Sequence, residues 1–192
     1  MGDNVSVHMI NDPIGAFPVI DLPMGYSFRA YRTGDEATWN FVQRGAERFF
    51  EIEDTLFRRE FGHDEAILAQ RMAFVVAPNG DAAATITAWW QDDWRGRGRW
   101  GQIHWVAVHP AHQRRGLSKP MMTWAMQQLA ASYPRAMLGT STGRAWAIKV
   151  YLDFGFVPDP VEMEKPEIVD AWRILQEKIR HPVLEGVTGN RR

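Results

Sequence analysis

The stretch Gln113-Arg114-Arg115-Gly116-Leu117-Ser118 joins a predicted strand to a predicted helix and decides the fold of this chain. Before it, residues 102–108 are rich in β-branched and aromatic side chains, which favours a strand that ends at His109-Pro110. After it, residues 117–132 carry apolar side chains at helical spacing. The first N–H groups of a helix lack partners and lie at the positive end of its dipole, so this junction is predicted to bind an anion such as phosphate.

The composition of the turn strengthens this interpretation. Gly116 allows a ligand to approach the backbone closely, and Arg114, Arg115 and Lys119 add positive charge. The net charge of the whole chain is only −1. The positive charge that matters is therefore local, and we expect neither a nucleic acid nor a membrane as a partner.

Length and composition predict one domain. The chain has 192 residues, of which 45% are hydrophobic, and this is enough for a single core. We expect an irregular lead-in at residues 1–24, one domain at 25–182 and a flexible tail at 183–192. Cysteine is absent, which excludes disulfides and thiolate nucleophiles and agrees with a cytoplasmic protein. No apolar run has the length of a membrane span.

The first half of the chain reads as one strand, two helices and an antiparallel meander. Asn79-Gly80, between two apolar runs, is a strong hairpin signal. Asp35 is the predicted N-cap of the first helix. The predicted elements are a strand at 26–31, helices at 36–46 and 64–70, and strands at 72–76, 83–90 and 100–108.

The second half alternates strands and helices. After the helix that follows the turn, the pattern predicts a strand at 136–141, a helix at 145–154, a short extended segment at 156–157 and an amphipathic helix at 166–180. The fold class is therefore mixed α/β. We expect a central mixed sheet that is antiparallel at its N-terminal side, helices on both faces and an added C-terminal helix.

The run from Val106 to Phe156 resembles the GNAT superfamily, the acyl-coenzyme A dependent N-acetyltransferases. The family pattern in the turn is Gln or Arg, two residues, Gly, one residue, then Gly or Ala, and this chain has it from Gln113 to Ser118. The run Val106–Pro110 resembles the strand and proline that precede that turn. Downstream, Ala147, Tyr151 and Gly155-Phe156 follow the family spacing. The resemblance implies a GNAT-like sheet.

Three positions depart from the family pattern. Ser118 stands where Gly or Ala is usual, but it is small and keeps its N–H. Pro120 lies early in the predicted helix, where its missing N–H still falls within the first turn. Arg144 occupies a helix start at which many family members carry Asn, which puts one cofactor or acceptor contact in doubt.

The resemblance implies acetyl-coenzyme A as co-substrate and no metal. Its pyrophosphate would lie on the N–H groups of the turn and its pantetheine arm beside the preceding strand, where a backbone N–H near Val106 could polarise the thioester carbonyl. The cofactor-binding residues expected on this basis are Val106, Ala107, Val108, Gln113, Arg114, Arg115, Gly116, Leu117, Ser118 and Lys119.

Amine acetylation needs a base for the ammonium and an acid for the departing thiolate. The resemblance assigns the acid to Tyr151. His104 is our candidate base, because imidazole titrates near neutral pH and the two-residue strand period places His104 on the face of Val106 and Val108. A histidine on a strand can equally be a satisfied core residue. Rival carboxylates occur in two segments: Glu47, Glu51, Glu53, Asp92 and Asp93.

The predicted function is direct transfer of an acetyl group from acetyl-coenzyme A to a primary amine, either a small molecule or a peptide amine, by an enzyme that could form a homodimer. A non-catalytic sensor of acyl-coenzyme A is the alternative. Nucleic-acid binding through the arginines between Trp94 and Trp100 is a weaker one, because the motif is a single short copy. His109 and His112 flank a proline turn, where metal ligation is improbable.

Overall fold

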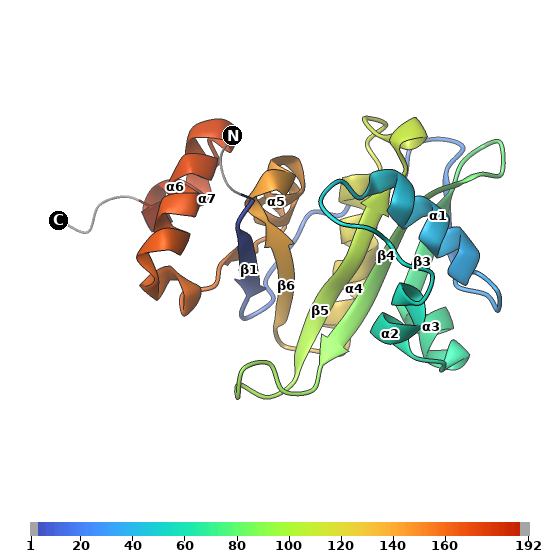
Figure 1. Ribbon diagram of the computed structural model, residues 1–192, viewed down its shortest axis with the longest axis horizontal. Coiled ribbons are helices and arrows are strands. Elements are labelled where there is room, and N and C mark those ends of the chain that lie inside the picture. The colour runs from blue at the N-terminus through green and yellow to red at the C-terminus, as the bar shows by residue number, and fades with distance from the viewer. Residues whose placement is uncertain (1–3, 189–192) are drawn as a thin grey trace. The chain divides into compact units, whose positions relative to one another are not determined.

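In the computed structural model, which describes residues 4–188, seven strands form a mixed sheet in the order β2-β3-β4-β5-β6-β1-β7 (Figure 1). Strand β1 pairs antiparallel with β6 and β7, and β3 pairs antiparallel with β2 and β4, whereas β5 and β6 are parallel. The chain forms two compact units. The central unit comprises Val19–Trp89 and Ile103–Gln128; the terminal unit comprises Met1–Pro18, Trp90–Gln102 and Leu129–Arg192. The predicted mixed α/β class with a helix-flanked sheet is confirmed.

The central unit is built on a meander. Strand β2 (Ser27–Ala30) pairs with β3 (Met72–Val76), and β3 pairs with β4 (Ala82–Gln91), with a register shift between Val75 and Val76. The turn between β3 and β4 is the predicted hairpin: Gly80 has φ 89°, a conformation that favours glycine. Strand β5 (Trp100–Val108) continues the sheet.

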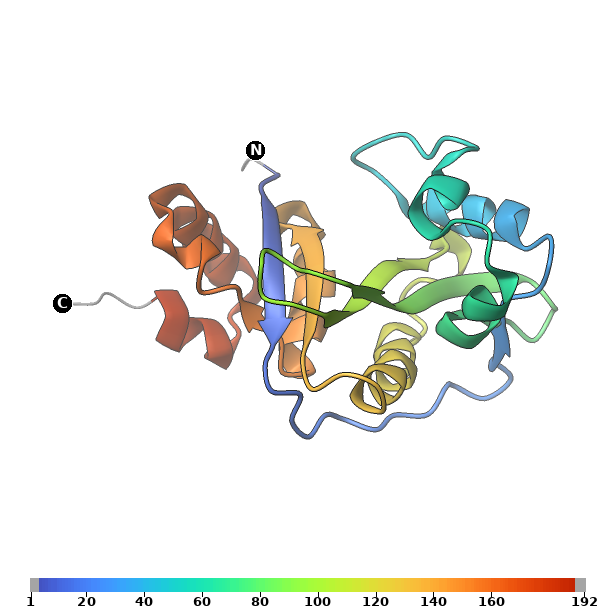
Figure 2. The ribbon, with the colours of Figure 1, turned by 90° about the horizontal axis from the view of Figure 1, so that it is seen from below.

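Helices lie on both faces of the sheet in the central unit. Helices α1 (Glu36–Ala46), α2 (Leu56–Phe61) and α3 (Glu65–Arg71) precede the hairpin, and α4 (Ser118–Ala130) follows the turn. Figure 2 shows α4 on one side of the strands and the α1–α2 region on the other. Trp39, Phe57, Phe61 and Phe74 are buried together in one apolar cluster, whose burial is the main stabilising term for this unit.

The terminal unit gathers both halves of the chain. Strand β6 (Ala136–Ser141) runs parallel to the start of β5, with Gly101 opposite Ala136. Strand β1 (Ser6–Asn11) pairs antiparallel with β6 and with β7 (Val157–Pro158). Its helices are α5 (Ala145–Asp153), α6 (Pro166–Ile179) and α7 (Pro182–Thr188), and short 3₁₀ turns occur at Thr142–Arg144 and Glu162–Glu164.

Two expectations for the chain ends are wrong. The lead-in is not irregular throughout, because β1 occupies Ser6–Asn11. Val7, Met9, Ile10 and Asn11 are all buried there, so the segment is a largely buried strand of the sheet. The tail is not unstructured from residue 183, because α7 begins at Pro182, where proline suits a first helical turn. Residues 1–3 and 189–192, which also belong to these two segments, lie outside the described residues.

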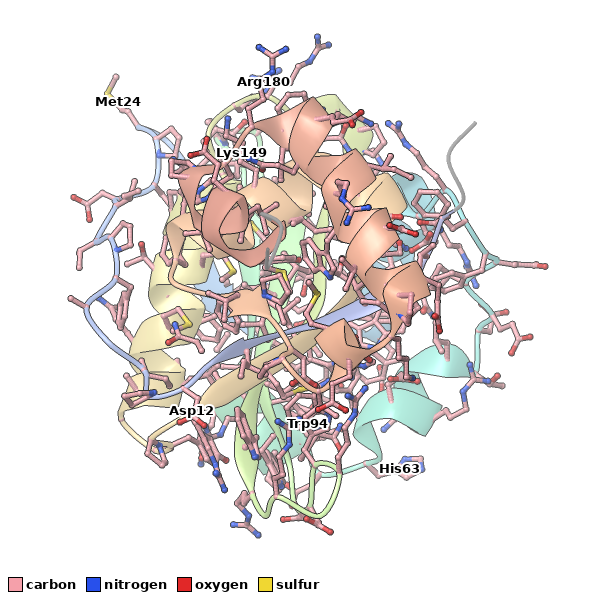
Figure 3. All side chains as sticks on the ribbon, turned by 90° about the vertical axis from the view of Figure 1, so that its left-hand side faces the viewer. Asp12, Met24, His63, Trp94, Lys149 and Arg180 are labelled. Atoms are coloured by element: carbon pink, nitrogen blue, oxygen red, sulfur yellow. The ribbon has the colours of Figure 1, made fainter. Side chains whose placement is uncertain are left out.

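Between Asp12 and Tyr26 the described chain has neither helix nor strand, as expected for that part of the lead-in. Met24 in this segment points away from the protein (Figure 3) and is 98% exposed. In the described part of the chain, no helix combines the length and the apolar character needed to cross a membrane.

Helix α2 is an element that the sequence interpretation missed. Residues 49–62 read as an aromatic segment, but Leu56–Phe61 are helical and bury Leu56, Phe57 and Phe61. The expected cap at Asp35 is also different: its side chain makes no capping bond and instead accepts hydrogen bonds from Arg29 and from the backbone of Arg32. Asp64 does cap a helix, accepting from the N–H of Ile67 at 3.1 Å.

Candidate functional site

The turn from Gln113 to Ser118 lies between β5 and α4, as predicted. Arg114 has φ 60° and Gly116 has φ 77°, so the backbone bends twice through the left-handed region before the helix begins. Arg114, Arg115 and Gly116 are exposed, whereas Leu117 is buried and anchors the turn. The turn therefore presents backbone and positive charge to solvent at a helix start.

A side-chain hydrogen bond holds the turn in place. The Gln113 side-chain amide donates to the Val108 carbonyl at 3.0 Å and ties the turn to the end of β5. Pro120 is the third residue of α4, where its lack of N–H costs the helix no intrahelical bond. The Pro120 departure is thus accommodated, and Ser118 is the exposed first residue of the helix.

The end of β5 packs closely against α1. A Cβ at Gly45 would lie 2.5 Å from the His109 ring, so only glycine fits at this helix position. The His109 ring stacks on Phe41 with 4.6 Å between centroids. His112 is buried and its Nδ1 lies 3.3 Å from the Tyr26 hydroxyl. Both histidines thus have packing contacts, and within residues 4–188 no three His, Asp or Glu side chains are grouped to hold a metal ion.

Strand β5 is interrupted at Trp105, which has φ 48°. This value is uncommon for a residue other than glycine and strains the backbone. It breaks the two-residue period, so His104 and Trp105 meet the same carboxylate instead of pointing to opposite faces. The expectation that a regular strand period places His104 with Val106 and Val108 is therefore wrong.

The shared carboxylate belongs to Glu60 on α2. Glu60 Oε2 lies 3.2 Å from His104 Nε2 and accepts a hydrogen bond from Trp105 Nε1 at 2.9 Å. The bond with His104 lowers the pKa of Glu60, against an opposing effect of burial and with help from the bond to Trp105. Glu60 was not among the candidate residues, because α2 was not predicted and nothing in the local sequence links it to His104.

The other predicted carboxylates lie elsewhere. Glu47, Glu51 and Glu53 line a pocket of about 480 Å³ with Arg44, Phe50, Ile52 and Asp54. Phe50 also meets the Trp105 ring at 6.1 Å. Asp92 pairs with Arg99, and Asp93 accepts from the N–H of Gly98 at 2.8 Å.

Tyr151 lies on α5 in the terminal unit, where it packs edge-on against Phe156 at 6.4 Å. Its side chain is 9% exposed, and burial raises the pKa of Tyr151 to about 12, with a smaller opposing effect of Arg144. The phenol therefore keeps its proton at neutral pH, as a general acid requires. Arg144 donates to the Ser141 hydroxyl at 2.6 Å.

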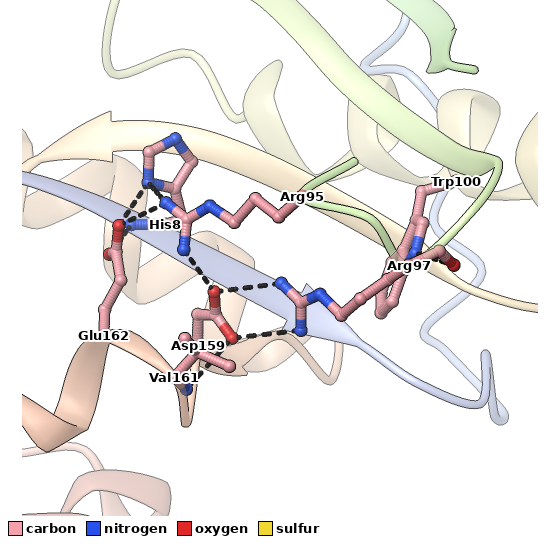
Figure 4. A network of polar contacts seen from close by, with 7 residues as sticks. All are labelled: His8, Arg95, Arg97, Trp100, Asp159, Val161 and Glu162. Atoms are coloured by element: carbon pink, nitrogen blue, oxygen red, sulfur yellow. Dashed lines mark hydrogen bonds and ion pairs between the residues drawn. The ribbon is translucent and has the colours of Figure 1, made fainter. Parts of the chain in front are cut away.

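The arginine loop of the terminal unit is occupied by internal ion pairs (Figure 4). Arg95 contacts Asp159 at 2.8 Å and Glu162 at 2.6 Å, and Arg97 contacts Asp159 at 3.2 Å. Burial raises the pKa of Glu162, but hydrogen bonds from Arg95 and His8 outweigh it, so the pKa is lowered overall. Trp94 and Trp100 are buried. These contacts argue against a nucleic-acid surface built on these two arginines.

Solved structures share this fold. A GCN5-related N-acetyltransferase from Sphaerobacter thermophilus has a TM-score of 0.65 at 16% identity, with 81% of this chain and 49% of that chain covered. One from Kribbella flavida scores 0.53 at 18% identity, covering 82% and 55%. A spermidine N-acetyltransferase from Vibrio cholerae, in complex with CoA and spermine, scores 0.51 at 15% identity, covering 71% and 83%.

The chain spans about half the length of the first of these structures. A search of curated proteins gives no match. The family model for GNAT acetyltransferases matches residues 36–156, more than half of the chain, and includes β5, the turn, α4 and α5. The chain therefore belongs to the GNAT acetyltransferase family.

Proposed function

We propose that this protein transfers an acetyl group from acetyl-coenzyme A directly to a primary amine, in a ternary complex and without an acyl-enzyme. The observation that carries the proposal is the turn from Gln113 to Ser118. Its backbone is exposed and basic, adopts the left-handed conformation at Arg114 and Gly116, and leads into the start of α4. Its residues have the spacing of the family pattern. Such a junction suits a pyrophosphate, because N–H groups and positive charge converge on it.

The chain's own residues would hold the cofactor as follows. The N–H groups from Arg114 to Lys119 bind the pyrophosphate, and the pantetheine arm lies along β5 at Val106, Ala107 and Val108. The Gln113 bond to the Val108 carbonyl supports this arrangement, because it fixes the turn relative to the strand. A backbone N–H near Val106 stabilises the oxyanion that forms on the thioester carbonyl.

Two side chains would move the protons. His104 removes a proton from the acceptor ammonium, whose reference pKa is about 10, and the Glu60 carboxylate lies 3.2 Å from its Nε2. Tyr151 gives its proton to the departing coenzyme A thiolate. Near pH 7 the phenol carries the proton that a donor must supply.

The acceptor class is open to direct measurement. We would mix the protein with acetyl-coenzyme A and a panel of primary amines that includes amino acids, aminoglycosides, polyamines and a peptide N-terminus, and follow thiol release. Polyamines are included because one structural relative was solved with spermine. Amine-dependent thiol release is the expected result. Binding of coenzyme A without thiol release from any amine would overturn the proposal and favour a sensor.

The turn itself is tested by Arg114→Glu with Arg115→Glu. We expect at least a tenfold weaker affinity for coenzyme A in calorimetry, because two attractive charges become repulsive beside the pyrophosphate. A matched control is Arg173→Glu, which changes an exposed arginine on α6. Undiminished affinity in the double variant would refute this binding site.

The absence of cysteine fits a reducing compartment, and we place the reaction in the cytoplasm.

A further inference from the structure

His104, Trp105 and Glu60 form one hydrogen-bonded group in the central unit. Adjacent residues of a regular strand point to opposite faces, yet both His104 and Trp105 contact Oε2 of Glu60, at 3.2 Å and 2.9 Å. The positive φ of Trp105 makes this possible. A strained backbone at a non-glycine residue persists where the surroundings hold it, and such strain is concentrated at functional sites.

We propose that Glu60 is the positioning residue of His104. Its carboxylate accepts a hydrogen bond from Nε2–H of the imidazole, so that Nδ1 is the nitrogen that takes the proton of the acceptor amine. This inference rests on the proposed function. It follows from the chemistry of neutral imidazole, in which one ring nitrogen carries the proton and donates a hydrogen bond while the other accepts. A fixed acceptor beside one nitrogen holds the proton there and leaves the other nitrogen as the base. An ionised carboxylate can only accept, so the nitrogen facing it carries the proton.

The group around Glu60 is built to hold that carboxylate still. Trp105 Nε1 gives it a second donor, and the Trp105 carbonyl in turn accepts from the Gln43 side chain at 3.0 Å. The Trp105 ring packs against Trp39 at 5.2 Å, and the His104 ring packs against Phe61 at 5.5 Å. Each member is thus fixed by contacts from α1 or α2, as a precise proton acceptor requires.

Glu60 is a charged side chain that faces His104 directly. The hydrogen bond with His104 lowers the pKa of Glu60, so the carboxylate is ionised near neutral pH. Arg59 acts on Glu60 and is the second charged group in this surrounding. The His104 side chain is 18% exposed and that of Glu60 is 27% exposed, so solvent screens their attraction only in part.

The protons of the reaction balance with this assignment. The acceptor ammonium loses one proton to His104 Nδ1, and the resulting imidazolium is stabilised by Glu60. The free amine attacks the thioester carbonyl; the C–N bond forms, the C–S bond breaks, and the thiolate takes the Tyr151 proton. The new amide nitrogen returns a proton to Tyr151, and His104 releases its proton to solvent. The net products are the amide, coenzyme A thiol and one proton.

Glu60→Gln tests the proposal, because the amide has the same shape without the charge. With both substrates saturating, kcat of Glu60→Gln should fall about tenfold, because the carboxylate that orients the imidazole is gone, while KM for acetyl-coenzyme A should change less than about twofold. Glu60→Asp, which keeps the charge, should restore part of the lost kcat. Glu177→Gln, an exposed glutamate on α6, is the matched control.

A second measurement does not need turnover. Two-dimensional ¹H–¹⁵N spectra of the imidazole should show the Nε2–H tautomer for His104 in the wild type and a mixture of the two neutral tautomers in Glu60→Gln. If the variant loses activity while the tautomer of His104 stays unchanged, Glu60 is merely structural and the proposal is overturned. If the wild type releases thiol and the Nδ1–H tautomer is found, the function stands and this assignment fails. No turnover by the wild type overturns both.

Discussion

Tyr151 shows at the scale of one residue how burial prepares a group for chemistry. Burial raises the pKa of this phenol to about 12, because an apolar surrounding disfavours the charged phenolate. A phenol that stays protonated at neutral pH cannot act as a base there. The role proposed for Tyr151 is the other one, donation of its proton to the departing thiolate.

Replacing Tyr151 by Phe should lower kcat about 100-fold or more, the usual contribution of a general acid, while the affinity for coenzyme A changes less than about twofold. Stopped-flow thiol release and calorimetry measure the two quantities. Tyr133→Phe, which removes the hydroxyl of a half-buried tyrosine after α4, is the control. Equal turnover in Tyr151→Phe and wild type would eliminate Tyr151 as the acid.

The same substitution predicts a change in the pH dependence of stability. The pKa of Tyr151 is raised in the folded state from 10.0 to about 12, so its contribution is complete below pH 10 and is lost as the pH rises from 10 to 12. In this window the unfolding free energy of the wild type should fall by about 2 kcal/mol more than that of Tyr151→Phe. Urea unfolding at pH 9.5 and pH 11.5 checks it. Identical pH dependence would show that burial does not shift this phenol.

At the scale of elements, the loop from Gln91 to Arg99 is held by carboxylates that come much later in the chain. Asp159 is fully buried, and its oxygens face Arg95, Arg97 and the N–H of Val161. A buried carboxylate needs such partners, because an unpaired charge away from water is costly. The loop thus owes its conformation to the segment after β7, and its arginines serve the fold.

Asp159→Asn should destabilise the protein by about 3 kcal/mol, because it removes the charged partner of the partly buried Arg97 and one of the two charged partners of Arg95. Asp170→Asn removes an exposed ion pair with Arg173, and the expected cost is below about 1 kcal/mol. Urea unfolding of both variants measures the difference. Similar stabilities would mean that solvent replaces Asp159 and that the network does not hold the loop.

At the scale of the molecule, the start of the described chain is part of the sheet. Strand β1 lies between β6 and β7, with Val7 opposite Thr140 and Ile10 opposite both Met137 and Val157 (Figure 1). The strand brings residues from the two ends of the sequence into one core. Its loss would expose the backbone of both neighbouring strands.

Met9→Ala measures this contribution. Met9 is fully buried in β1, and removing its side chain should cost about 3 kcal/mol through lost apolar burial and a cavity. Met24→Ala makes the same chemical change at a residue that is 98% exposed, and it should leave stability within about 0.5 kcal/mol of wild type. Thermal unfolding compares them. Equal melting temperatures would show that β1 adds little to the fold.

Several helices and strands were predictable because each is encoded within about a dozen neighbouring residues. The hairpin at Asn79-Gly80, the strand at 136–141 and the helix that starts at Pro166 all occur as the sequence indicates. Helix α2 escaped because six residues show less than two helical turns, too few for a periodic signal. The residues of the turn that we propose to bind the cofactor follow a motif whose spacing is itself local.

By itself, the sequence determined the mixed α/β class and the family, and it carries the proposal of an anion-binding turn, since backbone preference, apolar period and motif spacing act between near neighbours. The tertiary structure alone decided which distant groups meet. It placed Glu60 against His104, Asp159 against Arg95, and β1 between β6 and β7. The physical reason is that these contacts depend on how elements far apart in the sequence pack together. The left-handed backbone of Trp105, which no strand period predicts, also turns His104 toward its carboxylate.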